Sequence, residues 1–235
     1  MQVILENLRR DLIASADEHT KEISQHFFKE KTLFYGIKND LVGKIAKKYL
    51  PEIKQLTKKE VFGLCEELFK ADYCEEAFIA CDWVYSRNKE YLSEDFKIFE
   101  HWINEYINNW AKCDTLCNHS LATFIDMYSQ YLENLKIWAK SDNRWVKRAS
   151  AVTLIIPARR GRYLKDIFRI ADILLLDKDD MVQKGYGWML KAASESHQNE
   201  VFDYVMLHKT NMPRTALRYA IEKMPADLKK QAMAK

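Results

Sequence analysis

Glycine and proline are scarce in this chain of 235 residues, which holds 6 Gly and 4 Pro. All-β folds need many turn residues, and parallel α/β folds usually carry glycine-rich turns. A chain with so few Gly and Pro residues favours helices that are joined by short polar loops. The apolar residues agree, because they recur at helical intervals, as in Ile4, Leu8 and Leu12. The sequence therefore predicts an all-α fold.

The spacing of the helices indicates how they are arranged. About a dozen segments of roughly 10–16 residues are expected, and helix pairs recur roughly every 35–40 residues, as in HEAT and armadillo repeats. We expect a HEAT- or armadillo-like solenoid, an α–α superhelix with a concave basic face, forming a single domain over residues 1–235. A compact helical bundle is the alternative.

Local signals mark where individual helices begin and end. Ile23, Phe27 and Phe28 indicate a second helical segment after the first stripe. Pro51 is expected to stop a helix, and Thr57 and Glu60 form a capping box that starts the next. Further helices are predicted at residues 75–85, 93–107, 115–128, 131–139, 143–156, 163–176, 181–194, 200–207 and 215–224, with a short one after Pro225.

Charge is unevenly distributed along the chain, although the net charge is only +3. Residues 1–143 carry 19 Lys and Arg against 24 Asp and Glu, whereas residues 144–235 carry 18 against 10. A one-sided positive field suits a polyanion such as nucleic acid. An ordinary solvated surface is the alternative, and charge alone does not decide between them.

No membrane or secretory segment is expected, since no apolar run approaches the roughly 18 residues of a membrane span and the N-terminus lacks a signal pattern. An odd number of cysteines, 5, indicates reduced thiols and a cytoplasmic protein. Cys113, Cys117 and His119 lie close together, but no second pair completes four zinc ligands. We therefore expect no metal.

Trp110 and Asp114 are the first candidates for chemistry. Positions four apart lie on one face of a helix, so a helical segment here would place an indole beside a carboxylate. Such a pair could stabilise a cation that develops on a bound substrate. The alternative is a core tryptophan and an aspartate that caps a helix starting at Thr115.

Several other segments accompany this pair in a fixed order. They are Tyr35-Gly36-Ile37-Lys38, Ser141-Asp142-Asn143-Arg144-Trp145-Val146-Lys147-Arg148, Gly187-Trp188 and Arg214-Thr215-Ala216-Leu217-Arg218-Tyr219. Together with Trp-x-x-x-Asp, they resemble the AlkD family of bacterial DNA alkylation-repair glycosylases over nearly the whole chain. Each motif is weak alone, and the set is specific.

The resemblance implies both a fold and a reaction. Members of that family consist of HEAT-like repeats curved around duplex DNA. They remove cationic alkylated purines, typically 3-methyladenine and 7-methylguanine, by hydrolysing the N-glycosidic bond. They use no metal or organic cofactor and hold the lesion without a closed base pocket. We therefore expect duplex DNA containing alkylated purines as the partner, and a monomeric protein without cofactors.

The resemblance also implies roles for individual residues. Asp114 matches the catalytic aspartate, and Trp110 and Trp188 match the aromatic residues that flank the sugar of the lesion. Arg148 matches an arginine that contacts the DNA backbone, and Tyr35 matches a tyrosine near the same cleft. The family often has a second acidic or aromatic residue beside the first tryptophan, where this chain has Asn109 and Ala111.

Other tryptophans and basic residues are assigned from their positions. Trp138 and Trp145 lie on apolar stripes and are expected in the core. A further set of basic residues is predicted to contact phosphate, which positions DNA without reading its sequence. These residues are Lys147, beside Arg148, and the cluster Arg159, Arg160 and Arg162.

Three functions are compatible with these patterns. The leading one is a DNA glycosylase that acts on cationic alkylpurines, with Asp114 stabilising the sugar cation and positioning water. The second is a non-catalytic DNA-binding module of the same family. The third is a HEAT-like scaffold that binds other proteins.

Overall fold

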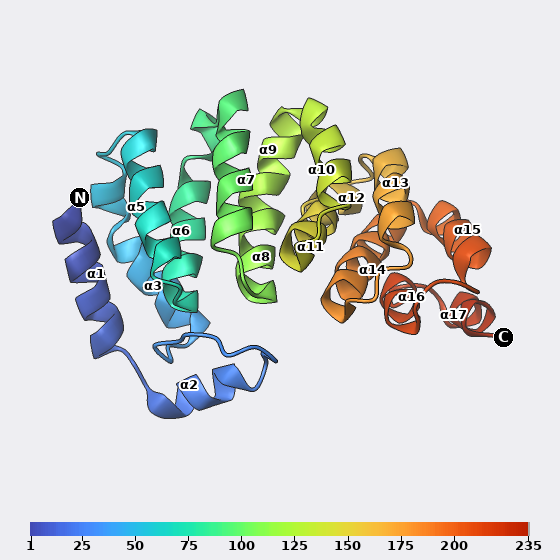
Figure 1. The fold of residues 1–235 in the computed structure, drawn as a ribbon, viewed down its shortest axis with the longest axis horizontal. Coiled ribbons are helices and arrows are strands. Elements are labelled where there is room, and N and C mark those ends of the chain that lie inside the picture. Colours follow the sequence, from blue (N-terminus) through green and yellow to red (C-terminus); the bar gives the residue numbers. More distant parts are fainter. Residues whose placement is uncertain (235) are drawn as a thin grey trace. The chain divides into compact units, whose positions relative to one another are not determined.

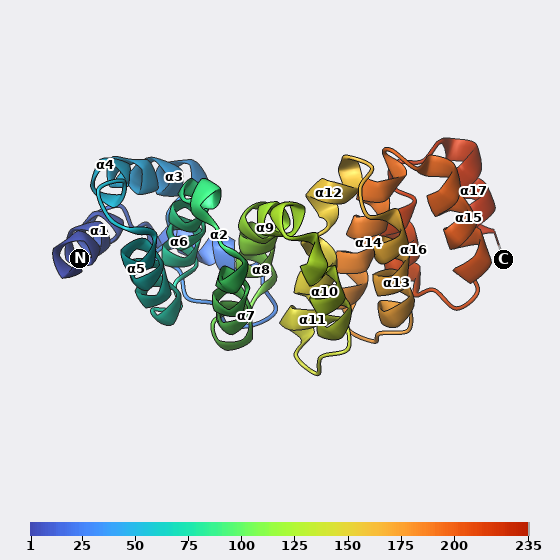
Figure 2. The same ribbon diagram turned by 90° about the horizontal axis from the view of Figure 1, so that it is seen from above.

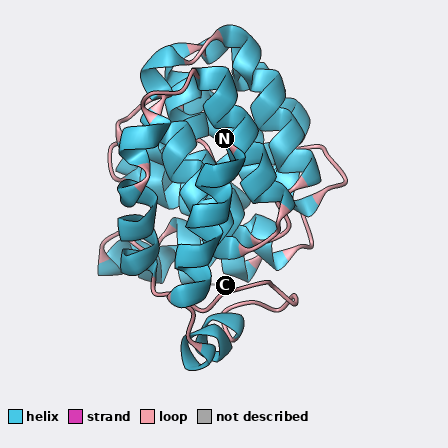
Figure 3. Ribbon diagram, turned by 90° about the vertical axis from the view of Figure 1, so that its left-hand side faces the viewer, coloured by secondary structure: helices cyan, strands magenta, loops and turns pink. Residues whose placement is uncertain are grey.

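The computed structural model describes residues 1–234, and over this range the chain is helical without a β-strand (Figures 1 and 3). Leu33 and Tyr73 make an isolated bridge. Successive helices pack on one another, as α5 does on α6 and α10 on α11. The prediction of an all-α helical-repeat fold is confirmed. Among the described helices, none is long and apolar enough to cross a membrane.

The helices form two compact units, Met1–Leu116 and Cys117–Lys235. The prediction of a single domain over residues 1–235, with a concave basic face, concerns how these units act together and stays a prediction. Each unit is built around one helix that contacts several others. That helix is α6 in unit 1 and α14 in unit 2.

In unit 1, α6 packs against α3, α5 and α8 (Figure 2). Trp83 of α6 is fully buried and donates from Nε1 to the carbonyl of Ala46 at 3.1 Å, which ties α6 to α3. The elements of unit 1 are α1 (Gln2–Ala14), α2 (Glu18–Gln25), α3 (Asn39–Lys48), α4 (Leu50–Ile53), α5 (Lys58–Lys70), α6 (Cys74–Ser86), the 3₁₀ turns η1 (Asn88–Glu90) and η2 (Ser93–Asp95), α7 (Phe96–Glu105) and α8 (Trp110–Leu116).

The start of α5 is as predicted, because Thr57 and Glu60 make both hydrogen bonds of the capping box. Pro51 follows the end of α3 at Lys48, as predicted. It lies in the first turn of the short helix α4, where its missing N–H costs nothing.

Residues 17–36 leave the body of unit 1 and return to it. Their helix α2 has no buried residue and lies apart from the other helices of the unit (Figure 1). The excursion closes at its base, where the N–H of Asp17 donates to the carbonyl of Gly36 at 3.1 Å. Gly36 has φ +90°, and a Cβ there would lie 2.2 Å from the Asp17 carbonyl oxygen, so this crossing requires glycine.

In unit 2, α14 packs against α11, α12, α13, α15 and α16. Residues on its inner faces, including Val182, Tyr186, Met189 and Leu190, are fully buried. The elements of unit 2 are the π-helical turn η3 (Cys117–Leu121), α9 (Ala122–Met127), the 3₁₀ turn η4 (Ser129–Tyr131), α10 (Leu132–Trp138), α11 (Arg144–Val152), α12 (Ile155–Arg159), α13 (Leu164–Leu174), α14 (Asp180–Ser194), α15 (Gln198–His208), α16 (Arg214–Ala220) and α17 (Ala226–Met233).

Two predicted helices are divided in the structure. The segment expected at 115–128 begins earlier, at Trp110, and is interrupted by the π-helical turn η3. The segment expected at 143–156 breaks into α11 and α12 at Thr153 and Leu154. Pro157 explains this second break, because its ring would clash with the carbonyl of Thr153 in a continuous helix.

Glycine sets the distance between α14 and α16. A Cβ on Gly187 would lie 2.7 Å from Cβ of Tyr219 and 2.8 Å from the carbonyl oxygen of Ala216, both in α16. The two helix backbones therefore touch at this position. Because a helix backbone cannot move as a flexible side chain does, a larger residue at 187 must push the helices apart.

We expect Gly187→Ala to lower the free energy of unfolding by about 1–3 kcal/mol, because overpacking there separates α14 from α16. The measurement is the midpoint of urea unfolding. Gly43→Ala in α3 is the matched control, since a Cβ there meets nothing within 4 Å. It should stabilise the protein by about 0.5–1 kcal/mol. Equal effects of the two substitutions would contradict the packing argument.

Candidate functional site

Trp110 and Asp114 lie one turn apart on α8, as the sequence predicts, and both side chains are half-buried. The helix begins at Trp110 because Asn109 caps it: the Asn109 Oδ1 accepts from the N–H of Lys112 at 3.0 Å. The alternative, in which Asp114 caps a helix that starts at Thr115, is therefore wrong. Asp114 shares the outer face of α8 with the indole.

The opposite face of α8 is anchored by a buried lysine. Lys112 is only 1% exposed, and its ammonium donates to the Asp72 carboxylate at 2.5 Å and to the Asp72 carbonyl at 2.8 Å. It also donates to Oδ1 of Asn108 at 3.1 Å. A buried ammonium needs all such partners, so α8 cannot rotate without losing them. This fixes the direction in which Trp110 and Asp114 point.

The excursion at residues 17–36 reaches Trp110. The indole Nε1 donates to the carbonyl of Phe27 at 3.3 Å, and the ring of Phe28 stacks on the indole with centroids 5.2 Å apart. Phe34 supports Phe28 at 5.3 Å. One face of Trp110 is therefore covered by residues that the sequence assigned to a helical stripe, whereas α2 ends at Gln25.

Tyr35 lies in unit 1 with its hydroxyl already engaged. It donates to Oε1 of the buried Glu76 at 2.7 Å, and Arg9 pairs with the same carboxylate at 3.0 Å. Its ring stacks on Tyr73 with centroids 4.2 Å apart. Burial, together with the bond to Glu76, raises the pKa of the Tyr35 hydroxyl, which therefore remains a donor. Contact between Tyr35 and DNA stays a prediction.

The backbone at Tyr35 is held just as firmly. The buried carboxylate of Glu75 accepts from the N–H groups of Tyr35, Gly36 and Ile37 at 2.9–3.2 Å. Three backbone donors that have no helical partner are thus satisfied by one side chain. Glu75 thereby fixes the end of the excursion that covers Trp110.

Trp188 lies on the face of α14 that is not fully buried. Lys184, Trp188 and Lys191 follow one another at helical spacing and are each half-buried, between buried residues such as Tyr186 and Met189. Lys184 pairs with Asp180 at 3.3 Å, and Lys191 pairs with Glu222 at 2.9 Å. The outer stripe of α14 thus alternates basic and aromatic side chains.

Arg148 and Lys147 on α11 are held within unit 2. Arg148 is 5% exposed and donates from Nη1 to the carbonyl of Met181 at 2.5 Å, while Gly185 leaves room for its stem. Lys147 pairs with Asp177 at 2.5 Å. Arg148 therefore joins α11 to the helix that carries Trp188. Contact of either residue with DNA stays a prediction.

The remaining sequence assignments divide between the core and the surface. Trp138 and Trp145 are buried, as predicted. Arg159 ends α12, Arg160 and Arg162 follow it before α13 begins, and all three are on the surface. All five cysteines are buried as free thiols, and burial raises the pKa of Cys74 to about 12.

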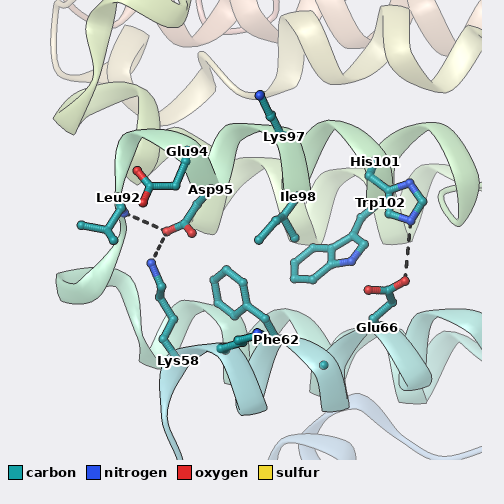
Figure 4. A pocket seen from close by; sticks show the side chains of 12 residues that line it. Lys58, Phe62, Glu66, Leu92, Glu94, Asp95, Lys97, Ile98, His101 and Trp102 are labelled. Carbon is teal, nitrogen blue, oxygen red and sulfur yellow. Dashed lines mark hydrogen bonds and ion pairs between the residues drawn. The ribbon is translucent and has the colours of Figure 1, made fainter.

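A separate cavity of about 670 Å³ lies in unit 1 between α5 and α7 (Figure 4). Phe62, Ile98 and Trp102 provide its apolar surface. Its margin carries the ion pair Lys58–Asp95 at 2.6 Å, and His101 Nε2 lies 3.6 Å from the Glu66 carboxylate. None of the residues that line it is a predicted site residue. The cavity is therefore distinct from the surface that carries Trp110 and Asp114.

Comparisons with known proteins identify the family and the fold of this chain. The model of the family "DNA alkylation repair enzyme" matches residues 8–224. A solved structure, described as a predicted DNA alkylation repair enzyme from Enterococcus faecalis, has a TM-score of 0.80 at 14% sequence identity. That alignment covers 90% of this chain and 98% of the other, and it shows the fold. Among curated proteins, none gives a significant match. Because the family match spans nearly the whole length, the chain belongs to the DNA alkylation repair enzyme family.

Proposed function

We propose that this protein is a DNA glycosylase that hydrolyses the N-glycosidic bond of cationic alkylated purines, such as 3-methyladenine and 7-methylguanine, in duplex DNA. One observation carries the proposal. Trp110 and Asp114 share the outer face of a helix whose inner face is anchored by the buried Lys112, in a chain of a DNA repair family. An aromatic ring and a carboxylate are thus held one turn apart on a half-buried face of this helix.

The chemistry of the substrate matches this pair. An N-alkylated purine is already cationic, so it leaves as a neutral base when the bond from C1′ to the ring nitrogen breaks and the electron pair goes to the purine. Positive charge then develops on the deoxyribose. The carboxylate of Asp114 stabilises that charge and orients a water molecule, whose oxygen adds to C1′ and whose proton is released.

Aromatic rings suit the same charge distribution. The face of an indole attracts a cation by about 0.5–2 kcal/mol, and most strongly where water is excluded. Trp110 offers the ring face that Phe28 does not cover, and Trp188 offers a second indole from unit 2. We assign both to the sugar and the cationic base.

Binding to DNA must be independent of sequence, because a lesion occurs in any context. Contacts with phosphate supply such binding and make it sensitive to salt. Lys184 and Lys191 flank Trp188 on α14 and are suited to this task. The sequence-predicted contacts of Arg148, Lys147, Tyr35 and the three arginines of residues 159–162 belong to the same proposal.

We expect Asp114→Asn to lower the rate of base release from methylated duplex DNA by about 10²–10³-fold, because it removes the charge that stabilises the transition state while keeping the shape. The measurement is the release of free methylated purine in single-turnover reactions. Affinity for undamaged duplex DNA should not fall.

Asp142→Asn is the matched control, since Asp142 is an exposed carboxylate in the loop before α11. It should leave base release unchanged. If the unaltered protein binds DNA but releases no purine above the spontaneous rate, the non-catalytic DNA-binding function is correct. A protein that does not bind DNA at all would instead be a scaffold.

Trp188→Ala should lower base release by about 3- to 30-fold, since a cation–π contact of this size is lost. Trp188→Phe keeps an aromatic face and should recover a large part of the rate. The two variants are compared by single-turnover release at saturating protein. If Trp188→Phe is as slow as Trp188→Ala, the indole contributes something other than its ring face.

A further inference from the structure

Three arginines of unit 2 are displayed by one ordered turn, which we call the arginine turn (residues 159–163). The N–H of Gly161 donates to the carbonyl of Ala158 at 2.9 Å, and the N–H of Arg162 donates to that of Pro157 at 3.0 Å. These two bonds, with Gly161 at φ +75°, are those of the glycine-containing motif that ends many helices. The backbone geometry at the end of α12 therefore determines where each arginine side chain leaves the turn.

The linker between α14 and α15 clamps this turn. Ser196 donates from Oγ to the carbonyl of Arg159 at 2.8 Å, and Nε2 of His197 lies 3.0 Å from the carbonyl oxygen of Gly161. A Cβ on Gly161 would lie 3.3 Å from the same His197 nitrogen. Tyr163 follows with φ +61°, a conformation that non-glycine residues adopt only when their surroundings impose it. The turn is thus ordered before any ligand arrives.

The arginines are exposed, and a single carboxylate lies between two of them. The side chains of Arg159, Arg160 and Arg162 are 46%, 65% and 47% exposed. Asp126, at the end of α9, is only 15% exposed and lies 3.4 Å from Arg160 and 2.9 Å from Arg162. Arg159 pairs separately with Glu195 at 3.3 Å. Two guanidinium groups therefore share one negative charge.

We propose that the arginine turn binds the DNA phosphodiester backbone and that Asp126 is an internal counter-ion that competes with phosphate for Arg160 and Arg162. The choice of DNA as the partner rests on the proposed function. Planar guanidinium groups match the geometry of phosphate oxygens, and two of them around one carboxylate keep a net positive charge. Asp126 holds both arginines in the free protein and repels phosphate in the complex.

The competition has a measurable size. A carboxylate about 7 Å from a phosphate, in a solvent-exposed setting, weakens binding by about 3- to 10-fold. The two arginines are themselves 65% and 47% exposed, so phosphate can approach them from solvent while Asp126 holds them from the protein side. Asp126 therefore limits the affinity for undamaged DNA, which an enzyme that searches for rare lesions must leave quickly.

The test is equilibrium binding of the full chain to an undamaged DNA duplex, over a range of salt concentrations. Asp126→Asn keeps the shape of the side chain and removes its charge. It should tighten binding by about 3- to 10-fold at low salt. The slope of log affinity against log salt should become steeper by up to about 0.9, which corresponds to one more neutralised phosphate.

Two controls distinguish competition from a general effect of charge. Asp227→Asn makes the same change of net charge at an exposed residue of α17 and should leave binding nearly unchanged. In a background with Arg160→Ala and Arg162→Ala, Asp126→Asn should no longer tighten binding. The double arginine variant should itself bind more weakly and with a shallower salt dependence.

An equal gain in Asp227→Asn, a gain that persists without the two arginines, or weaker binding by Asp126→Asn would overturn the proposal. Thermal unfolding of each variant establishes that it is folded, and the arginine double variant tests the site even if Asp126→Asn is unstable. Because undamaged DNA is used, failure of base release would overturn the proposed glycosylase and leave this result standing.

Discussion

The buried ammonium of Lys112 is the interaction on which the candidate site depends. A charge that is 1% exposed is tolerated only with its full set of hydrogen bonds, here from Asp72 and Asn108. Those bonds determine the rotation of α8, and the rotation determines that Trp110 and Asp114 face outward. Asp72 adopts φ +66° to bring its carboxylate and its carbonyl to the same ammonium, so local strain in one loop supports the geometry of another element.

In unit 2 close packing, rather than a buried charge, fixes the corresponding helix. Gly187 brings α14 into backbone contact with α16, and Gly185 makes room for Arg148 of α11 on the neighbouring side. Because α16 and α11 cover two sides of α14, the side chains of Lys184, Trp188 and Lys191 lie on the side that remains. Gly185 and Gly187 thus fix the orientation of Trp188, as Lys112 fixes that of Trp110. Both helices carry their candidate residues on faces that are only partly buried.

Sequence reasoning succeeded where the relevant spacing was local. The Trp110–Asp114 pair, the capping box at Thr57 and the burial of Trp138 and Trp145 follow from helical periodicity within one segment. It failed where partners lie far apart along the chain. Phe27 is 83 residues from Trp110, so the helical periodicity of either segment does not indicate their contact. The bond from Arg148 to the carbonyl of Met181, 33 residues away, is equally invisible to local spacing.

The basic side chains of this chain are either buried or exposed. The exposed ones explain how a protein with many internal ion pairs can still bind DNA. Lys112 is 1% exposed, and moving its charge to a phosphate would leave the groups of Asp72 and Asn108 unpaired. Arg160 and Arg162 are 65% and 47% exposed, so phosphate can reach them while the less exposed Asp126 stays in place. Residues 144–235 carry 18 basic against 10 acidic residues, and the exposed basic residues can therefore bind DNA at the lowest cost to the core.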